Sequence, residues 1–221
     1  METLYNCHYN ELFQLYGNGH FDLAIVDPPY GIDVNSMPLG SGKYKSDKKW
    51  DCSPPDEAYF KELFRVAKHV VLWGANHYID RIPNPDSPCW LIWDKRNGTS
   101  DFADAELAWT NFDCPVRKFS YSLSQCSKAE IKNRFHPTQK PIQLYKWILT
   151  NFAKPGWKIL DTHLGSATIA RACHSLGFDI TGCEIEKEYY TQAMEGLKEY
   201  KKNNLTIFGV ENKQEEQQQL F

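Results

Sequence analysis

The amino-acid sequence predicts an α/β fold: a doubly wound, mainly parallel sheet covered by helices on both faces. Short apolar segments with the composition of buried strands alternate with segments of helical period, and this alternation is typical of such sheets. The length of 221 residues and the hydrophobic content of 42% suit one domain with a sizeable core. We therefore expect one folded domain at residues 1–208, followed by a polar, glutamine-rich tail at 209–221.

The individual segments support this prediction in turn. The expected strands are apolar runs bounded by Gly, Pro or polar residues, and they span 21–26, 70–73, 89–93, 105–109, 158–160, 178–183 and 205–208. The expected helices repeat apolar residues at helical spacing, and they span 56–68, 141–152, 165–176 and 187–201. Asp56 is a suitable N-cap for the first helix. A Gly-, Ser-, Pro- and Lys-rich segment at 32–56 has no sustained period, so we expect a long mobile loop there.

Composition argues against several classes of protein. No apolar run reaches transmembrane length, and the first residues lack a signal-peptide pattern, so we expect a cytoplasmic protein. The seven cysteines are an odd number and include no Cys-x-x-Cys pair. The sequence therefore predicts neither a disulfide framework nor a metal site.

Basic residues gather in two segments, although the formal net charge of −3 is not that of a typical nucleic-acid binder. The first segment contains Lys43, Lys45, Lys48 and Lys49, and the second contains Arg117, Lys118, Lys128, Lys132 and Arg134. Such segregation fits a basic face that contacts phosphates. It fits two solvated loops equally well, and charge alone does not separate the two interpretations.

The most informative segment joins the apolar strand at 23–26 to the loop Asp27-Pro28-Pro29-Tyr30. Two consecutive prolines fix φ and remove two backbone donors, so the chain leaves the sheet in an extended conformation. The loop then presents a carboxylate, the Pro28 carbonyl and the Tyr30 ring close together. This combination suits a planar ring with an exocyclic amino group, because the two oxygens accept from the amine and the tyrosine stacks on the ring.

A second constellation follows the strand at 158–160. Asp161 leads into a turn of small residues that opens a helix, and such a turn lets a ligand approach the backbone and the free N–H groups of the helix start. A zwitterionic amino-acid moiety would fit, with its ammonium facing Asp161. Glu184 ends the next strand, where doubly wound folds place an acid on ribose hydroxyls. If the strands that end at Asp27 and Asp161 are neighbours, the amino-bearing ring and the nucleoside meet in one crevice.

Four motifs carry a resemblance to a known family: Asp27-Pro-Pro-Tyr-Gly31, Leu91-Ile-Trp-Asp-Lys95, His136-Pro-Thr-Gln-Lys-Pro141 and Leu160-Asp-Thr-His-Leu-Gly-Ser166. In this order they resemble the amino-DNA methyltransferases of the β group, in which the catalytic motif precedes the S-adenosylmethionine motif. The resemblance covers residues 1–200 approximately. It implies a Rossmann-like, S-adenosylmethionine-dependent methyltransferase fold that acts on DNA, with base flipping of the target nucleotide.

The resemblance also implies roles for residues. The catalytic set is Asp27, Pro28, Pro29 and Tyr30: Asp27 and the Pro28 carbonyl would accept hydrogen bonds from the target amine, and Tyr30 would stack on the extruded base. The set implied for the cofactor is Asp161, Thr162, His163, Leu164, Gly165, Ser166, Ala167, Thr168 and Glu184, with Thr138 and Lys140 near the methionine end. The basic residues named above would contact DNA.

The chain departs from the family pattern in two places. The family usually has Asp-Pro-Phe-x-Gly-Ser-Gly in the cofactor loop, and this chain has Thr162, His163 and Ala167 instead of Pro, Phe and the last Gly. We expect the loop path to survive if φ of Ala167 stays negative. The family also commonly has an acid in the segment that matches Asn6-Cys7-His8, where this chain has none.

The expected reaction is methyl transfer to the N6 amine of adenine in DNA. The N4 amine of cytosine is an alternative, although enzymes of that kind more often carry Ser-Pro-Pro-Tyr. RNA or a protein glutamine is a further alternative, and a catalytically silent nucleoside- or DNA-binding module is an alternative of another class. Only residues 113–133 stand where the family places its target-recognition region, so recognition would be of low specificity, shared with the 32–56 loop, or dependent on a second subunit in a homodimer. The end of the tail, residues 217–221, resembles peptides that dock on the bacterial sliding clamp, and a polar tail without function is the alternative.

Overall fold

The computed structural model of this chain describes residues 1–32, 53–98, 103–127, 130–131, 134 and 138–204. These residues build one eight-stranded sheet with the strand order β1-β8-β7-β2-β3-β5-β4-β6. No helix among them is both long and apolar enough to span a membrane. The predicted strand at 205–208 and the tail at 209–221 lie outside the described residues, as does most of the predicted loop at 32–56.

The strands are mainly parallel, as the sequence predicts. They are β1 (Glu2–Tyr5), β2 (Phe21–Val26), β3 (Ala67–Trp73), β4 (Trp90–Asp94), β5 (Ala105–Thr110), β6 (Arg117–Ser120), β7 (Lys158–Asp161) and β8 (Asp179–Cys183). Strand β5 runs antiparallel to both of its neighbours, β3 and β4, and every other pair is parallel. The amino end of β5 therefore lies at the same edge of the sheet as the carboxyl ends of the other strands.

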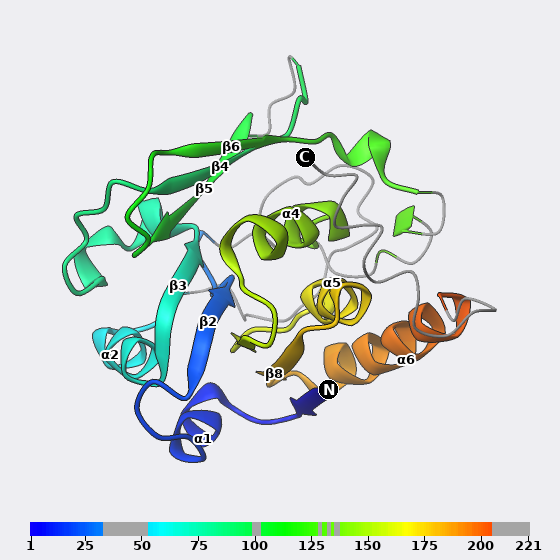
Figure 1. Cartoon of the computed structure of the whole chain (residues 1–221), viewed down its shortest axis with the longest axis horizontal. Coiled ribbons are helices and arrows are strands. Elements are labelled where there is room, and N and C mark those ends of the chain that lie inside the picture. The colour runs from blue at the N-terminus through cyan, green and yellow to red at the C-terminus, as the bar shows by residue number, and fades with distance from the viewer. Residues whose placement is uncertain (33–52, 99–102, 128–129, 132–133, 135–137, 205–221) are drawn as a thin grey trace.

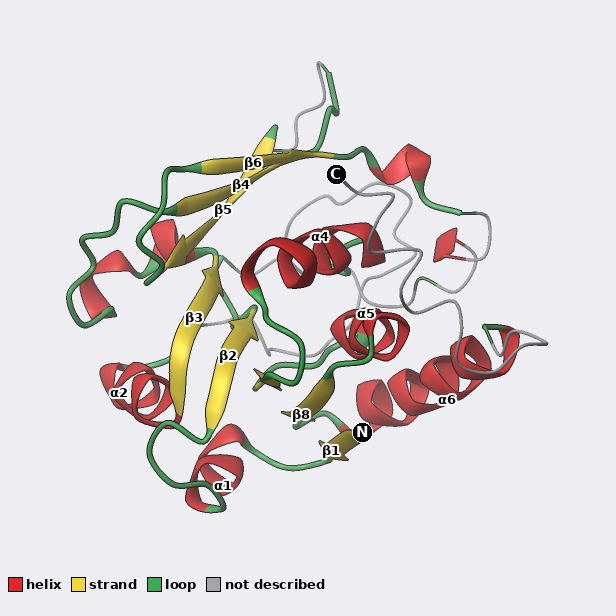
Figure 2. Ribbon diagram, viewed as in Figure 1, coloured by secondary structure: helices red, strands yellow, loops and turns green. Residues whose placement is uncertain are grey.

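Helices cover both faces of the sheet, as Figures 1 and 2 show. They are α1 (Tyr9–Gln14), α2 (Glu57–Val66), α4 (Ile142–Phe152), α5 (Thr168–Leu176) and α6 (Lys187–Asn203), with short 3₁₀ turns η2 (Ala75–His77), η3 (Ile79–Arg81) and η4 (Leu123–Gln125). Helices α1 and α2 lie on one face and α4, α5 and α6 on the other. The chain is thus a three-layer, doubly wound domain.

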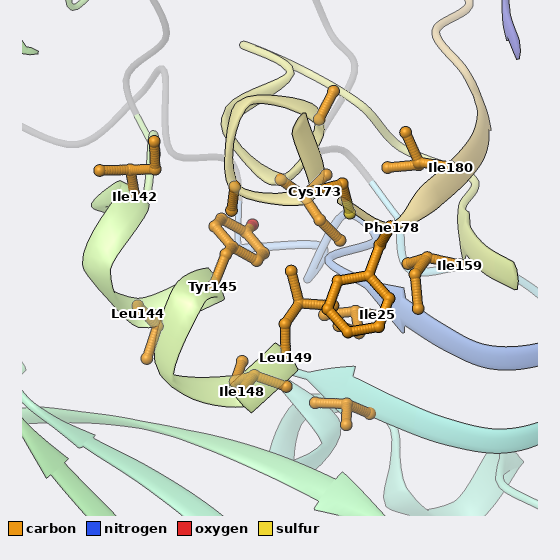
Figure 3. Packing of buried hydrophobic residues seen from close by; sticks show 14 of the residues in the cluster. Ile25, Ile142, Leu144, Tyr145, Ile148, Leu149, Ile159, Cys173, Phe178 and Ile180 are labelled. Atoms are coloured by element: carbon orange, nitrogen blue, oxygen red, sulfur yellow. The ribbon is translucent and has the colours of Figure 1, made fainter. Parts of the chain in front are cut away.

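The two faces of the sheet have separate hydrophobic cores, because successive side chains of a strand point in opposite directions. In β2, Leu23 and Ile25 pack with α4, α5 and α6, whereas Ala24 and Val26 pack with α1 and α2. Figure 3 shows the first core, where Tyr145 and Leu149 of α4 lie close to Cys173 of α5 and to strand residues such as Ile25. A strand that is buried on both faces reads as a continuous apolar run, and the sequence predicted β2 correctly for this reason.

Most predicted elements are confirmed, and the differences have physical causes. Asp56 caps α2 through a 3.0 Å bond from the Tyr59 N–H, but the helix ends at Val66 because β3 begins at once. Helix α5 begins at Thr168 rather than residue 165, because a tight turn precedes it. The sequence did not predict β1, α1 or β6. Strands β1 and β6 are edge strands of four residues, too short and too polar for a periodic pattern.

Candidate active site

Two acidic strand ends lie side by side. Strands β2 and β7 pair in parallel, with Leu23 opposite Ile159 and Ala24 opposite Leu160. Asp27, directly after β2, and Asp161, at the end of β7, therefore lie at the same edge of the sheet. The sequence analysis required these two strands to be neighbours, and they are. The Asp27 loop and the Asp161 loop therefore open on one crevice.

A cavity of about 700 Å³ lies at this edge. Predicted site residues make up much of its wall: Asp27, Pro29, Thr138, Lys140, Thr162, His163, Leu164, Gly165, Ser166 and Glu184. The predicted residues Pro28, Tyr30, Asp161 and Ala167 are not in the wall but are next to wall residues in the chain. Thr168 Oγ1 lies 2.8 Å from Oγ of Ser166, which is in the wall. The rest of the lining includes Tyr145 of α4 and the segments at 7–9, 53–56 and 185–186, which the sequence did not predict as site residues.

The rigid loop after β2 holds Asp27 at the cavity. The Tyr30 hydroxyl donates to Asp27 Oδ1 at 2.6 Å, and the Lys140 ammonium donates to Asp27 Oδ2 at 2.5 Å. The Tyr30 ring stacks on His77 and packs directly over Gly74, where an added Cβ would stand 2.0 Å from the ring. Gly74 also has a φ of +71°, so glycine is required there both for the backbone and for the tyrosine.

Lys140 is the centre of a buried charge cluster. Its side chain is 2% exposed, and its Nζ lies 2.5 Å from Asp27 and 3.0 Å from Glu106. Glu106 also pairs with Lys95 at 2.7 Å, so two cations and two anions are linked in a row. The sequence placed Lys140 near the cofactor; the structure places it in contact with Asp27 as well as in the cavity wall.

This cluster sets the ionisation of its members. Burial opposes a charge on Lys140, but the Asp27 and Glu106 carboxylates outweigh burial and raise the pKa of Lys140 above its ordinary value. Burial is also opposed at Glu106, where Lys140 and Lys95 lower the pKa to about 2. At Asp27 burial prevails and raises the pKa, although Lys140 acts against this shift.

The sequence assigned no role in the site to Glu106 or Lys95, although Lys95 ends one of the four motifs. Glu106 is the second residue of β5, and it reaches the site because β5 alone brings its amino end to this edge. One feature of the sequence could have indicated Glu106: it is the single acid in an otherwise apolar predicted strand. A buried charge rarely occurs in proteins without a partner of opposite charge. Strand direction, which selects the partner, is not visible in the local sequence.

The loop after β7 has a different construction. Asp161 is 3% exposed, and its Oδ1 accepts from the backbone N–H of His163 at 3.0 Å. Burial raises the pKa of Asp161 to about 8, and the nearby Asp27 and Glu184 carboxylates add to this shift. Glu184 accepts from the backbone N–H groups of Gly165 and Glu186, which joins the end of β8 to the loop.

Ala167 differs from the expectation for this loop. Its φ is +53°, in the left-handed region, rather than negative. The residue closes a turn in which its N–H donates to Leu164 O at 2.7 Å, and it also caps α5. The loop path therefore survives with an alanine in a conformation that favours glycine, at a cost of about 1 kcal/mol.

The segment that lacks the family's acid contributes in another way. The Asn6 side-chain amide donates to the carbonyls of Glu184 and Ile185 at 2.8 and 3.2 Å. Cys7, His8 and the first residue of α1 then line the cavity. The N-terminal segment thus positions the end of β8 through its amide group.

The predicted DNA-contacting residues are only partly described. Arg117 and Lys118 are exposed on β6, at one edge of the sheet, where Lys118 lies 3.3 Å from Asp94. Arg134 is half-buried, and none of the three residues lines the cavity. Lys43, Lys45, Lys48, Lys49, Lys128 and Lys132 lie outside the described residues.

The arrangement combines a strand-end anion with a cavity large enough for a nucleoside-sized ligand. Within the described part of the chain, no group of three or more His, Cys, Asp or Glu side chains is placed to hold a metal ion. The carboxylate of Asp27 can accept a hydrogen bond, and a proton, from a polar group that enters the cavity.

Comparisons with known proteins agree on one family. A family model described as DNA methylase matches residues 90–195. Type II methyltransferase M.HpaI of Haemophilus parainfluenzae is 40% identical over 224 residues, which cover 80% of this chain and 68% of that protein. Type II methyltransferase M2.DpnII of Streptococcus pneumoniae is 25% identical over 226 residues, which cover 83% of this chain and 84% of that protein.

Solved structures show the same fold. The crystal structure of the M1.HpyAVI-SAM complex matches with a TM-score of 0.63 and 20% identity, over 89% of this chain and 99% of that chain. The PvuII DNA methyltransferase, named as cytosine-N4-specific, matches with a TM-score of 0.63 and 10% identity, over 91% of this chain and 90% of that chain. These likenesses confirm the predicted Rossmann-like fold.

Proposed function

Because the chain belongs to the amino-DNA methyltransferase family, we propose that it transfers a methyl group from S-adenosylmethionine to the N6 amine of adenine in DNA. Methylation of DNA with S-adenosylmethionine as donor follows from the family. The adenine N6 atom as acceptor, and the roles given to residues below, are our proposal.

The observation that carries the proposal is the position of Asp27. Asp27 directly follows β2 and lines the same cavity as Gly165 and Glu184. An aromatic amine is a poor nucleophile, because its lone pair is delocalised into the ring. A carboxylate and the Pro28 carbonyl that accept its two N–H groups favour a pyramidal nitrogen, whose lone pair is then free to attack.

The cavity suits the cofactor in size and lining. Its volume of about 700 Å³ lies in the usual range for pockets that hold small molecules. Gly165 and Ser166 permit close approach to the backbone, and Glu184 stands where an acid binds ribose hydroxyls. When bound, S-adenosylmethionine supplies a methyl group that is already activated by its sulfonium.

Both oxygens of Asp27 have partners before the amine enters, so the amine must displace or share one of them. Lys140 has a second carboxylate, Glu106, that retains it when Asp27 turns to the amine. Bound S-adenosylmethionine would supply its methyl group to the nitrogen that Asp27 and the Pro28 carbonyl hold, and the leaving sulfur would keep the electrons of its bond to the methyl group. The methylated nitrogen then releases a proton, and Asp27 is the base within reach.

Adenine is favoured over cytosine by the first residue of the loop. The resemblance associates Asp-Pro-Pro-Tyr more often with adenine and Ser-Pro-Pro-Tyr more often with cytosine, and this chain has Asp27. The fold does not favour either base, since a neighbour of equal TM-score is named as cytosine-N4-specific. The N4 amine of cytosine therefore remains the second candidate.

The test is to incubate the protein with methyl-labelled S-adenosylmethionine and unmodified genomic DNA, and then to digest the DNA to nucleosides. We expect the label in N6-methyladenine, and Asp27→Ala, as matched control, should yield none. Label in N4-methylcytosine would overturn the choice of base. Calorimetric titration with S-adenosylmethionine addresses the silent-module alternative, which would gain support if millimolar cofactor did not bind.

A further inference from the structure

A row of three hydroxyl and imidazole groups leads from the core to the cavity. Tyr59 of α2 is 1% exposed, and its hydroxyl lies 2.7 Å from Thr162 Oγ1. The Thr162 hydroxyl lies 2.9 Å from His163 Nδ1, and His163 lines the cavity. His163 is one of the residues at which this chain departs from the family pattern.

The direction of these hydrogen bonds follows from counting donors. Among the described residues, Thr162 Oγ1 is the one hydrogen-bond partner of the buried Tyr59 hydroxyl. The phenol proton must therefore be donated to Thr162, because a buried O–H without an acceptor is costly. The Thr162 hydroxyl then donates its own proton to His163 Nδ1. If the row ran the other way, the Tyr59 proton would have no acceptor.

The protonation state of His163 follows from the same geometry and from burial. Nδ1 is an acceptor in this row, so the ring proton of a neutral imidazole is on Nε2. Burial lowers the pKa of His163 to about 3, and the neighbouring His8 adds to this shift, so the ring is neutral in the physiological range. No described residue is a hydrogen-bond partner of Nε2, and the ring packs against both Tyr9 and Tyr59, which also touch each other, with centroids 5.4 Å from each.

We propose that His163 binds the cofactor by donating a hydrogen bond from Nε2 to an oxygen or ring-nitrogen acceptor of S-adenosylmethionine, and that Tyr59 and Thr162 are positioning residues that set its tautomer. This proposal rests on the proposed function. A neutral donor suits this ligand, because an imidazolium in the same wall would repel the sulfonium. The row fixes the first property by leaving the ring proton on Nε2, and burial keeps the ring without charge.

The tautomer can be tested without the cofactor. The full-length protein labelled with ¹⁵N-histidine is observed by two-bond ¹H–¹⁵N correlation, with the His163 signals assigned from His163→Phe. We expect a neutral ring with the proton on Nε2 at pH 7, and a mixture of tautomers in Tyr59→Phe. Tyr78→Phe is the matched control, because it removes another buried hydroxyl from the same core without touching the row. A proton on Nδ1, or an imidazolium, in the unaltered protein would overturn the proposal.

Calorimetric titration with S-adenosylmethionine tests the hydrogen bond. Loss of one neutral hydrogen bond should weaken binding about three- to tenfold in His163→Phe. His163→Gln, whose amide nitrogen reaches the place of Nε2, should retain more affinity than His163→Asn, whose amide nitrogen reaches only the place of Nδ1. If the unaltered protein binds and His163→Phe binds equally well, this inference is wrong while the proposed function stands. If the unaltered protein does not bind, the proposed function itself is wrong.

Discussion

The two aspartates at the ends of β2 and β7 lie on paired strands, yet their electrostatic surroundings are opposite. Asp27 receives the Lys140 ammonium at 2.5 Å and the Tyr30 hydroxyl at 2.6 Å. The bond that Asp161 accepts is from the backbone N–H of His163 at 3.0 Å. Burial raises the pKa of both, but of the two aspartates Lys140 contacts Asp27 and not Asp161, and the pKa of Asp161 reaches about 8.

This difference indicates what each carboxyl group is prepared to do. The fold supplies Asp27 with a cation of its own, so it serves as an anionic acceptor before any ligand arrives. Among the described residues no cation contacts Asp161, and under the proposed function the ligand brings one. The ammonium of a methionine moiety is such a cation. Under the proposed function, the strand end that would perform the chemistry is electrostatically complete, and the strand end that would bind the cofactor is incomplete.

The largest expected effect separates the two roles. Asp27→Ala removes the acceptor of the target amine and should lower the rate of methyl transfer by about 10³-fold or more. Affinity for S-adenosylmethionine should change by less than about threefold, because the proposed partner of Asp27 is the target amine and not the cofactor. Single-turnover kinetics and calorimetry measure the two quantities. Loss of cofactor affinity in this variant would mean that the two strand ends do not have separate roles.

A smaller effect is expected when the cation is removed from Asp27. Lys140→Met leaves Asp27 and Glu106 facing each other without a shared cation, which should raise the pKa of Asp27 further. We expect transfer at neutral pH to fall about 10²-fold and the pH–rate profile to move to higher pH.

A double variant controls for the stability of the cluster. Glu106→Gln combined with Lys140→Met removes one charge of each sign, so folding should suffer less than in Lys140→Met alone. If Lys140→Met leaves the rate of methyl transfer unchanged and lowers the affinity for S-adenosylmethionine more than about tenfold, Lys140 acts at the methionine end of the cofactor, as the sequence suggested.

The smallest expected effect concerns stability, at the other strand end. The folded-state pKa of Asp161, about 8, exceeds its ordinary value of 3.8, so the folded state binds more protons between these pH values. The contribution of Asp161 to stability is therefore full at low pH and decreases as pH rises from about 4 to 8. Asp161→Asn removes this penalty and should raise the free energy of unfolding of the cofactor-free protein at pH 7 by about 1–3 kcal/mol.

Urea denaturation at several pH values measures this change. The difference between Asp161→Asn and the unaltered protein should vanish below about pH 4, where Asp161 is protonated in both folded and unfolded states. The same variant should bind S-adenosylmethionine more weakly, because the ammonium loses its partner. A variant that is less stable than the unaltered protein at pH 7 would show that Asp161 is held as an anion, as Asp27 is.

Much of the fold and of the site was predictable from local patterns. Strands that are buried on both faces read as short apolar runs, so β2, β3 and β7 stood out in the sequence. The Asp27 loop was also recognisable, because two prolines and an acid restrict the chain whatever surrounds them. Edge strands β1 and β6 were missed, since a strand that is half exposed and four residues long has no pattern to detect.

The sequence by itself determined that rigid acidic loop, the small-residue turn after β7, and their order in the chain, because each depends on the chemistry of adjacent residues. Only the tertiary structure decided which charges meet. Lys140 contacts Asp27, 113 positions away, and Glu106 joins them because β5 runs against its neighbours. The pKa of a carboxyl group depends on such partners and on burial, and both arise when distant segments pack together.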